Sequence, residues 1–434
     1  MLLKQSRVQW PDLTRVKRIE SWPMGRPLRV LFASDALHST TGYGKQAVLA
    51  VAALHQLGVD VAFLNTYGLS GAHFDLPELP GVKVYSGGAD GFANDVIPLA
   101  YEDWKADVLI TLKDTPVFRP EVVGNVRWAP LTPVDHEPAP PQVQQMVRAA
   151  WWPIAYAPNG VRSLRSIGLN PLYVPHAYDP DIYSPSDRQA ARIALGWPQG
   201  PKIVSTVAVN RGGLPSRKAW PQLFEAMGIV RRKLGDAAPV WYCHTSHGED
   251  GFEGGVNLLA MAHAYGLADR VLFPDQRAYR YAGGYGEDFI ANVYRSSDLL
   301  LAVSLGEGFG VPILESQACG TPVLGGRWAA AEDLLWSEPQ LTRADAVPYM
   351  DNQGSNVFIP NPERIAAAVL DHLDNPLSDI ERERMVNSAA ELTIQRVADN
   401  EWRDAVCRIA DRIAHEGKYG RGVQQIIRIN EVFR

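Results

Sequence analysis

At 434 residues, the chain is long for a single hydrophobic core and favours two domains of ordinary size. Its 46% hydrophobic and 21% charged residues exclude a disordered chain, and its formal net charge of −6 argues against a stable nucleic-acid partner. The three widely spaced cysteines match neither a disulfide framework nor a zinc site, and no apolar run reaches the length of a membrane span. We therefore expect a cytoplasmic location.

Residues 1–27 form a leader that precedes the first predicted strand. Five Lys or Arg residues lie among apolar residues in its first 22 positions, and no hydrophobic signal-peptide segment is present. We expect the leader to pack on the first domain. The alternative is a peripheral contact with an anionic membrane.

Residues 28–185 are predicted to form the first domain. Short apolar strands alternate with amphipathic helices, which is typical of a doubly wound parallel sheet. The helix expected over 45–57 ends before Gly58, a residue that favours helix ends. Strands are expected at 28–34, 59–64, 82–85, 108–112 and 126–131. A stretch rich in Pro and Asp from Val174 onward indicates the crossing to a second domain.

Residues 186–400 repeat the pattern, so the second domain is also expected to be Rossmann-like. The fold class is therefore α/β, with two doubly wound domains facing a cleft. Strands are expected at 202–209, 240–244, 271–274 and 299–304, with a helix over 220–232. From Glu363 onward the pattern is helical, and residues 401–434 are expected to form a helical segment that returns to the first domain.

The segment 304–326, SLGEGFGVPILESQACGTPVLGG, is the most informative part of the chain. A buried strand leads into a glycine-rich turn, and a helix then opens with Pro312 near its first position. Free backbone N–H groups and the helix dipole make such a turn an anion site. Glu307 in the turn and Glu315 in the helix supply carboxylates, which accept hydrogen bonds from sugar hydroxyls.

The two glutamates of EGFGVPILE, with seven residues between them, resemble the signature of the retaining glycosyltransferases of family four, which have the GT-B fold. The resemblance implies that Glu307 contacts the donor sugar beside its reacting carbon and that Glu315 holds the ribose hydroxyls. It also implies that the N–H groups of Gly308, Phe309 and Gly310 face the diphosphate and the sugar.

A second match lies in VAVNRGGLPSRKAW, where cations follow a strand and can neutralise a diphosphate. The family carries an arginine and a lysine at this place, and Lys218 fits the lysine. Arg211 stands about two residues from the usual spacing of the arginine, so Arg217 is the alternative.

Two further matches lie in the first domain. His136 follows a predicted strand in LTPVDHEPAPP, and the family's histidine at the corresponding place reaches the donor sugar or the reaction centre. TGYGKQA imitates a dinucleotide fingerprint, but it follows its strand only after a loop, and no acidic residue ends the second strand. By the resemblance, Gly42, Tyr43 and Gly44 form a loop that lines the cleft.

The sequence thus predicts a retaining transferase that moves a sugar from a nucleoside-diphosphate sugar to an acceptor hydroxyl. Glu307, His136 and Lys218 are the expected catalytic residues. Asp179-Pro180-Asp181 is interpreted as a turn rather than a metal site, so we expect neither an essential metal nor another cofactor. The acceptor is left open between a glycan, a lipid, a protein and a modified nucleic acid. The alternatives are a silent subunit that binds nucleotide sugars, a phosphorylase or a nucleotide-sugar epimerase.

Overall fold

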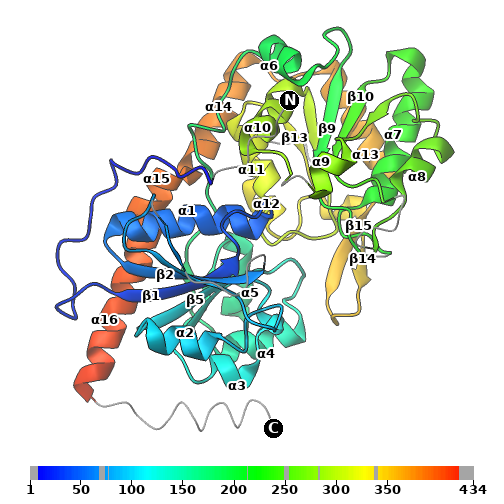
Figure 1. Ribbon diagram of the computed structural model, residues 1–434. Helices are drawn as coiled ribbons and strands as arrows, with labels where there is room; N and C mark the ends of the chain where they lie inside the picture. The colour runs from blue at the N-terminus through cyan, green and yellow to red at the C-terminus, as the bar shows by residue number, and fades with distance from the viewer. Residues whose placement is uncertain are drawn as a thin grey trace. The chain divides into compact units, whose positions relative to one another are not determined.

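The computed structural model describes residues 8–67, 74–76, 78–212, 214–248, 254–281, 284–336 and 341–419. The chain divides into two compact units (Figure 1). Unit 1 comprises Pro180–Glu391 together with the short segment Asp135–Glu137. Unit 2 comprises the described residues up to Val134, then Pro138–Asp179, and the chain from Leu392 onward.

The chain crosses between the units at other places than the sequence predicted. The first crossing falls after Asp179 instead of after residue 185, and the return falls at Leu392 instead of residue 401. The reason is a local pairing within unit 2. The N–H of Tyr178 donates to Leu392 O at 3.2 Å, and the N–H of Ile394 donates to Tyr178 O at 3.0 Å. These two bonds directly join the two segments at which the chain passes between the units.

Unit 2 contains an eight-stranded sheet whose order is β3-β4-β2-β1-β5-β6-β7-β8. All neighbouring strands are parallel except β3, which runs antiparallel to β4. Six residues of β1 are buried in succession, as expected for a strand with both faces covered. The strands are β1 (Arg29–Asp35), β2 (Asp60–Tyr67), β3 (Phe74–Asp75), β4 (Lys83–Tyr85), β5 (Val108–Leu112), β6 (Trp128–Thr132), β7 (Ile154–Ala155) and β8 (Leu172–Tyr173).

The helices of unit 2 come from both ends of the chain. They are α1 (Gly42–Leu57), α2 (Ile97–Asp103), α3 (Pro120–Val123), α4 (Pro141–Ala149), α5 (Pro158–Ser166), α15 (Ile394–Val397) and α16 (Arg403–Tyr419). Helix α16 is fastened to the sheet side of unit 2 by aromatic and charged contacts. The guanidinium of Arg412 lies 4.2 Å from the ring centre of Trp151, and the Trp151 indole N–H donates to Glu416 at 2.9 Å. The predicted segment beyond residue 419 lies outside the described residues.

Unit 1 contains a five-stranded parallel sheet in the order β11-β10-β9-β12-β13 and a separate antiparallel hairpin, β14-β15. The sequence did not predict the hairpin. The strands are β9 (Ile203–Val207), β10 (Val240–His244), β11 (Val271–Leu272), β12 (Leu299–Leu301), β13 (Val323–Leu324), β14 (Ala346–Met350) and β15 (Asn356–Pro360). The helices are α6 (Arg188–Leu195), α7 (Trp220–Leu234), α8 (Leu258–Ala264), α9 (Gln276–Tyr281), α10 (Glu287–Ser296), α11 (Val311–Ala318), α12 (Ala331–Leu334), α13 (Pro362–Asp374) and α14 (Asp379–Ala389).

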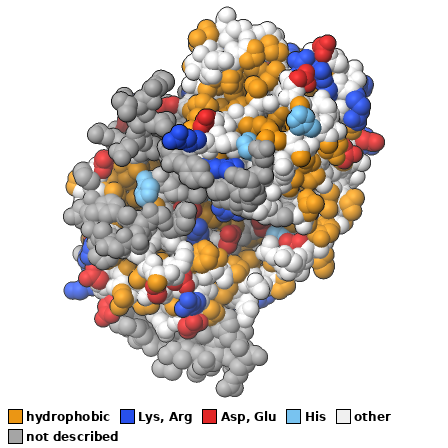
Figure 2. Space-filling model, turned by 45° about the vertical axis from the view of Figure 1, so that its right-hand side comes forward, with side chains coloured by type: hydrophobic (Ala, Val, Ile, Leu, Met, Phe, Trp, Pro, Cys, Tyr) orange, Lys and Arg blue, Asp and Glu red, His pale blue; other side chains and the backbone are white. Residues whose placement is uncertain are grey.

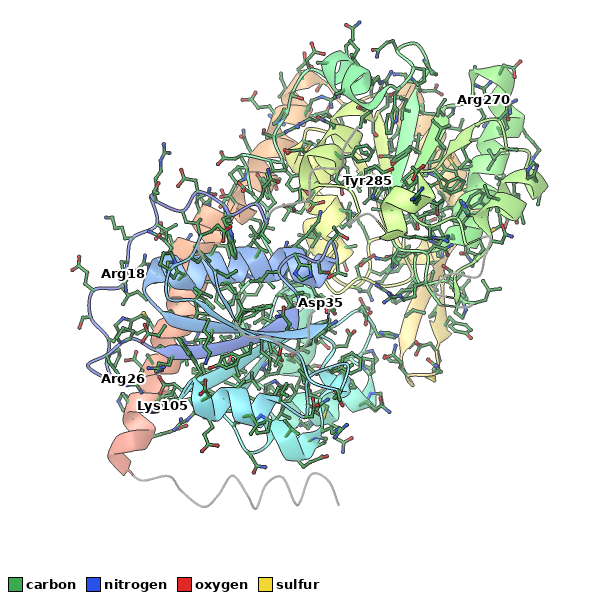
Figure 3. The ribbon with its side chains drawn as sticks, viewed as in Figure 1. Arg18, Arg26, Asp35, Lys105, Arg270 and Tyr285 are labelled. Carbon is green, nitrogen blue, oxygen red and sulfur yellow. The ribbon has the colours of Figure 1, made fainter. Side chains whose placement is uncertain are left out.

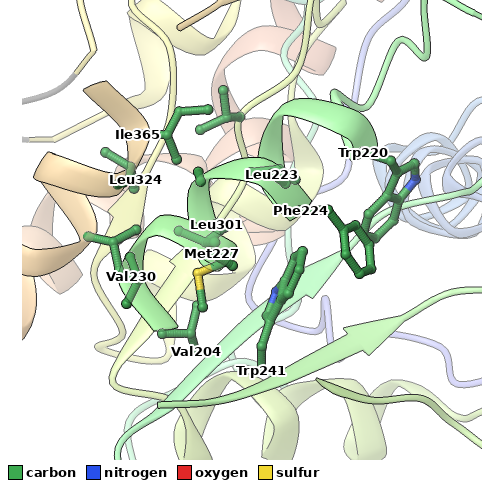
Figure 4. Close-up of a cluster of buried hydrophobic side chains, with 14 of the residues drawn as sticks. Val204, Trp220, Leu223, Phe224, Met227, Val230, Trp241, Leu301, Leu324 and Ile365 are labelled. Carbon is green, nitrogen blue, oxygen red and sulfur yellow. The ribbon is translucent and has the colours of Figure 1, made fainter. Parts of the chain in front are cut away.

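The core of unit 1 lies between α7 and the sheet (Figure 4). Trp220, Phe224 and Trp241 are fully buried there, and the rings of Phe224 and Trp241 are 4.8 Å apart. The indole N–H of Trp241 donates to Thr206 at 3.0 Å, and that of Trp220 donates to Val209 O at 3.3 Å. This packing fixes the first turn of α7, and with it the basic loop that ends at residue 219.

The described part of the leader packs on unit 2. Leu13 and Val16 are buried, and Gln56 of α1 donates to Val16 O at 2.9 Å. These two apolar side chains therefore belong to the packed interior, while residues 1–7 lie outside the described part of the chain. Within the described residues, none of the helices combines the length and the apolar character needed to span a bilayer. On the face drawn in Figure 2, basic and acidic side chains lie interspersed.

Candidate active site

The glycine-rich loop 302–310 joins β12 to α11 and is held on both sides. The N–H of Leu305 donates to Arg217 O at 2.8 Å, and the N–H of Phe358 donates to Leu305 O at 2.9 Å. Gly310 immediately before α11 has a φ of +102°, a conformation that favours glycine. The loop thus delivers the start of α11 to the carboxyl end of β12, and it lies beside the loop that follows β9.

Glu307, Lys218 and Arg217 come together at this edge of the sheet. The carboxylate of Glu307 forms an ion pair with the ammonium group of Lys218, and Arg217 lies 3.6 Å from the same carboxylate. Arg217 also donates to Gly306 O at 3.2 Å and is half exposed, whereas the other two side chains are mostly buried. Because β9 and β12 are neighbours at the point where the strand order reverses, this is the usual ligand position of a doubly wound sheet.

The charges of this cluster stabilise one another. Burial alone would raise the pKa of Glu307, but the positive charges of Lys218 and Arg217 outweigh it and hold the pKa of Glu307 below its usual value. Burial lowers the pKa of Lys218, and the charge of Glu307 opposes that shift. The cluster therefore consists of one carboxylate and two basic side chains, and it suits a ligand that carries negative charge.

Glu315 lies inside α11 and is 4% exposed. Its Oε2 accepts a hydrogen bond of 2.8 Å from the hydroxyl of Tyr294, a residue of α10. Within the turn, Phe309 is buried and Gly308 is half-buried. Arg211 lies in the loop after β9 and is exposed, next to Asn210, whose side chain binds Ser246 O and Val256 O. Of the two candidate arginines, the structure thus brings Arg217 to Glu307.

His136 is clamped by two carboxylates within unit 1. Its Nδ1 lies 2.7 Å from Asp135 Oδ1, its Nε2 lies 2.9 Å from Asp351 Oδ2, and the side chain is 2% exposed. Burial disfavours the charged imidazole, but the hydrogen bonds and charges of Asp135 and Asp351 outweigh it and raise the pKa of His136. The surroundings of His136 therefore favour the charged, hydrogen-bonded form of the imidazole.

Glu137 beside His136 fastens the same segment to unit 1. Its N–H donates to Asn356 O at 2.9 Å, and its carboxylate accepts from Ala329 N at 2.8 Å and pairs with Arg343 at 2.5 Å. Sequence reasoning missed Asp351 and Arg343, because both are far from residue 136 in the sequence. Asp351 lies in the turn of a hairpin that showed no strand signal, and Arg343 lies in the short turn before that hairpin.

Gly42, Tyr43 and Gly44 do not form a loop, so that expectation is wrong. They are the first residues of α1, which begins at Gly42 instead of Lys45. The cause is a helix cap, since Thr41 Oγ1 accepts from Gly44 N at 3.0 Å. A Cβ at Gly44 would lie 2.7 Å from Ser39 O, so glycine is required there for close packing.

A second polar cluster lies at the carboxyl ends of β1 and β5 in unit 2, where the order of that sheet reverses. Asp35 at the end of β1 (Figure 3) forms an ion pair with Lys113, which follows β5, and both are mostly buried. The Lys113 ammonium group lies 5.2 Å from the ring centre of Tyr43, whose hydroxyl donates to Asp114 at 3.0 Å. Sequence reasoning did not single out Asp35 or Lys113, although each stands directly at the end of a predicted strand.

The described residues contain no group of three or more His, Cys, Asp or Glu side chains that could hold a metal ion. Pro180 and Asp181 lie in a turn, as interpreted from the sequence, and Asp179 before them is buried. Part of the histidine-containing stretch after β10, residues 249–253, lies outside the described residues.

Residues 206–375 match the family model described as Glycosyl transferases group 1. The D-inositol 3-phosphate glycosyltransferase of Gordonia bronchialis is 36% identical over 149 residues, which are 34% of this chain and 30% of the relative. The protein of the same name from Stackebrandtia nassauensis is 30% identical over 210 residues, which are 46% of this chain and 43% of the relative. The matched segments therefore span less than half the length of these relatives.

Solved structures resemble the chain over most of its length. Sucrose-phosphate synthase from Thermosynechococcus elongatus has a TM-score of 0.62 at 16% identity and covers 90% of this chain and 98% of its own. Anabaena HepE in complex with UDP-glucose has a TM-score of 0.55 at 15% identity and covers 91% of this chain and 100% of its own. At such identities the likeness concerns the fold, and it confirms the two parallel α/β sheets expected from the sequence.

Proposed function

We propose that this chain, whose residues 206–375 match the family model of the glycosyl transferases group 1, moves a sugar from a nucleoside-diphosphate sugar to an acceptor hydroxyl. The observation that carries the proposal is the cluster of Glu307, Lys218 and Arg217 beside the N-terminus of α11. Two cations and a helix N-terminus at the carboxyl end of a parallel sheet suit a diphosphate.

In this proposal, Lys218 and Arg217 bind the diphosphate together with the N–H groups of Gly308, Phe309 and Gly310. Glu315 receives the ribose hydroxyls, since an ionised carboxylate accepts hydrogen bonds and donates none. The structure of Anabaena HepE, which resembles this chain in fold, contains UDP-glucose, so UDP-sugars are the first donors to test. The two cations and the helix dipole supply the charge stabilisation that a metal would otherwise provide, so we propose transfer without a metal.

The proposed reaction retains the configuration of the anomeric carbon. The acceptor oxygen forms its bond to that carbon on the face from which the phosphate departs, the bond between carbon and phosphate oxygen breaks, and the hydroxyl proton passes to the departing phosphate oxygen. Glu307 is held as an anion by Lys218, so its part is to orient the donor sugar and balance charge. His136, whose charged form is favoured by Asp135 and Asp351, donates hydrogen bonds to the donor once a ligand competes with Asp351.

The acceptor is proposed to contact unit 2 at the cluster of Asp35, Lys113 and Tyr43. This cluster offers a hydrogen-bond donor, carboxylate acceptors and an aromatic ring, which together suit a hydroxyl-rich molecule. The curated relatives are named for D-inositol 3-phosphate, so this compound is the first acceptor to test.

The experiment is a melting-temperature screen with UDP, GDP and ADP, followed by incubation with the labelled sugar donor of the base that binds. We expect one base to raise the melting temperature, since a ligand at a hundred times its Kd stabilises the folded state by about 2.7 kcal/mol. We also expect that donor to be cleaved slowly with water and faster with D-inositol 3-phosphate. Binding without any cleavage would favour the silent subunit, and no binding of any of the three nucleotides would contradict the proposal.

A further inference from the structure

Tyr294 of α10 touches the candidate ribose-binding carboxylate directly. Its side chain is fully buried, and its hydroxyl donates to Glu315 Oε2 at 2.8 Å. The backbone carbonyl of Tyr294 accepts from the Thr321 hydroxyl at 2.6 Å, which ties the end of α10 to the residues that follow α11. The tyrosine is thus fixed at both its backbone and its hydroxyl.

The surroundings of this pair leave the two groups little freedom. Glu315 is 4% exposed, so most of its carboxylate is out of water and needs protein partners. The ring of Tyr294 lies 6.2 Å from that of Tyr183, another buried tyrosine. A hydrogen bond to a charged acceptor is among the stronger ones in proteins, so it sets the rotation of the carboxylate.

We propose that Tyr294 is a positioning residue for the nucleotide, because it holds the Glu315 carboxylate in the orientation that receives the ribose hydroxyls. The inference rests on the proposed function, which assigns the ribose to Glu315. A carboxylate has about four lone-pair sites, so one hydrogen bond from Tyr294 still allows it to accept from hydroxyl groups. The phenol contributes geometry and touches neither the sugar nor the phosphate.

If the hydrogen bond between Tyr294 and Glu315 were purely structural, its loss would have a different effect on nucleotide binding. Its loss would lower stability and weaken every nucleotide equally. A positioning bond affects only the part of binding that depends on ribose hydroxyls. The readout is therefore the preference for a nucleoside diphosphate over its 2′,3′-dideoxy counterpart, measured on variants that melt alike.

The test compares Tyr294→Phe with Tyr242→Phe. Both replacements remove one buried hydroxyl of unit 1 and keep the ring, but the Tyr242 hydroxyl lies 3.0 Å from His244 Nδ1. Affinities are measured by calorimetry for UDP, GDP and ADP and for their 2′,3′-dideoxy forms. We expect the preference for ribose to fall about tenfold in Tyr294→Phe and to stay within about twofold of the unmodified chain in Tyr242→Phe.

An equal preference for ribose in the two variants would overturn the inference while leaving the proposed function intact. Failure of all three nucleotides to bind the unmodified chain would instead remove the proposed function, and the inference with it. If Tyr294→Phe does not fold, 3-fluorotyrosine at position 294 keeps the shape of the ring and donates more strongly. It should then increase the preference for ribose, and an unchanged preference would contradict the inference.

Discussion

Glu307 and Lys218 are a buried ion pair, so Glu307→Gln leaves Lys218 without this partner, and Lys218→Ala leaves Glu307 with the more distant Arg217. We expect Glu307→Gln and Lys218→Ala each to lower the turnover of sugar transfer about a hundredfold or more, because both act on the charge that develops as the donor bond breaks. Steady-state kinetics with the donor identified by the nucleotide screen measures this. The double variant is the control, since it removes both charges. It should melt closer to the unmodified chain than either single variant and still be inactive. Near-normal turnover in folded single variants would contradict the assigned roles.

Single residues also show how much of the candidate site could be predicted from the sequence. Resemblance to a known motif pointed to Glu307, Glu315 and Lys218, and the structure places Glu307 and Lys218 in contact. The motif could not decide between Arg211 and Arg217, because the loop after β9 is longer than the usual one. Only the fold shows that Arg217 contacts Gly306. Tyr294 gave no signal, since one tyrosine on an apolar helix face is indistinguishable from core until its partner is known. Asp351 likewise can be recognised as a site residue only from its contact with His136 in the structure.

Among the helices and strands, the start of α1 allows a test of whether close packing explains the glycine at position 44. A Cβ at Gly44 would lie 2.7 Å from Ser39 O and 3.0 Å from Ala36 O, whereas one at Gly42 meets nothing within 4 Å. We expect Gly44→Ala to lower the free energy of unfolding by about 1–3 kcal/mol through overpacking. Gly42→Ala should be neutral or stabilising by up to about 1 kcal/mol. Chemical denaturation of both variants measures this. Equal effects would show that packing does not explain Gly44.

The elements differ in how readily their patterns reveal them. The strands β5 and β10 were predicted to the residue, because both are short runs of β-forming residues almost wholly buried within a parallel sheet. The hairpin β14-β15 was missed, since four of the five β14 residues are exposed and the strand shows no alternation of buried and exposed positions. The predicted start of helix α1 was too late in the sequence, because two glycines in its first turn disfavour a helix prediction. In the structure, the Thr41 cap stabilises that turn.

Over the whole molecule, two buried histidines have pKa values shifted in opposite directions. His176 in unit 2 is stacked on Tyr156, with ring centres 4.1 Å apart, and burial lowers its pKa to about 3. His136 in unit 1 has a raised pKa because, despite burial, Asp135 and Asp351 favour its charged form. These two side chains therefore make stability depend on pH in opposite directions.

The sign of each effect follows from proton linkage. Below the unfolded pKa of about 6.5, the unfolded chain protonates His176 and the folded chain does not, so stability falls as the pH drops from there towards 3. Between pH 6.5 and pH 5 this amounts to about 2 kcal/mol. The contribution of His136 is complete below about pH 6.5 and is lost as the pH rises through its raised folded pKa. We expect His176→Phe to flatten the acid side of the curve of melting temperature against pH, and His136→Gln to flatten the alkaline side. Variants whose curves parallel that of the unmodified chain would show that neither histidine is held in the charge state its surroundings favour.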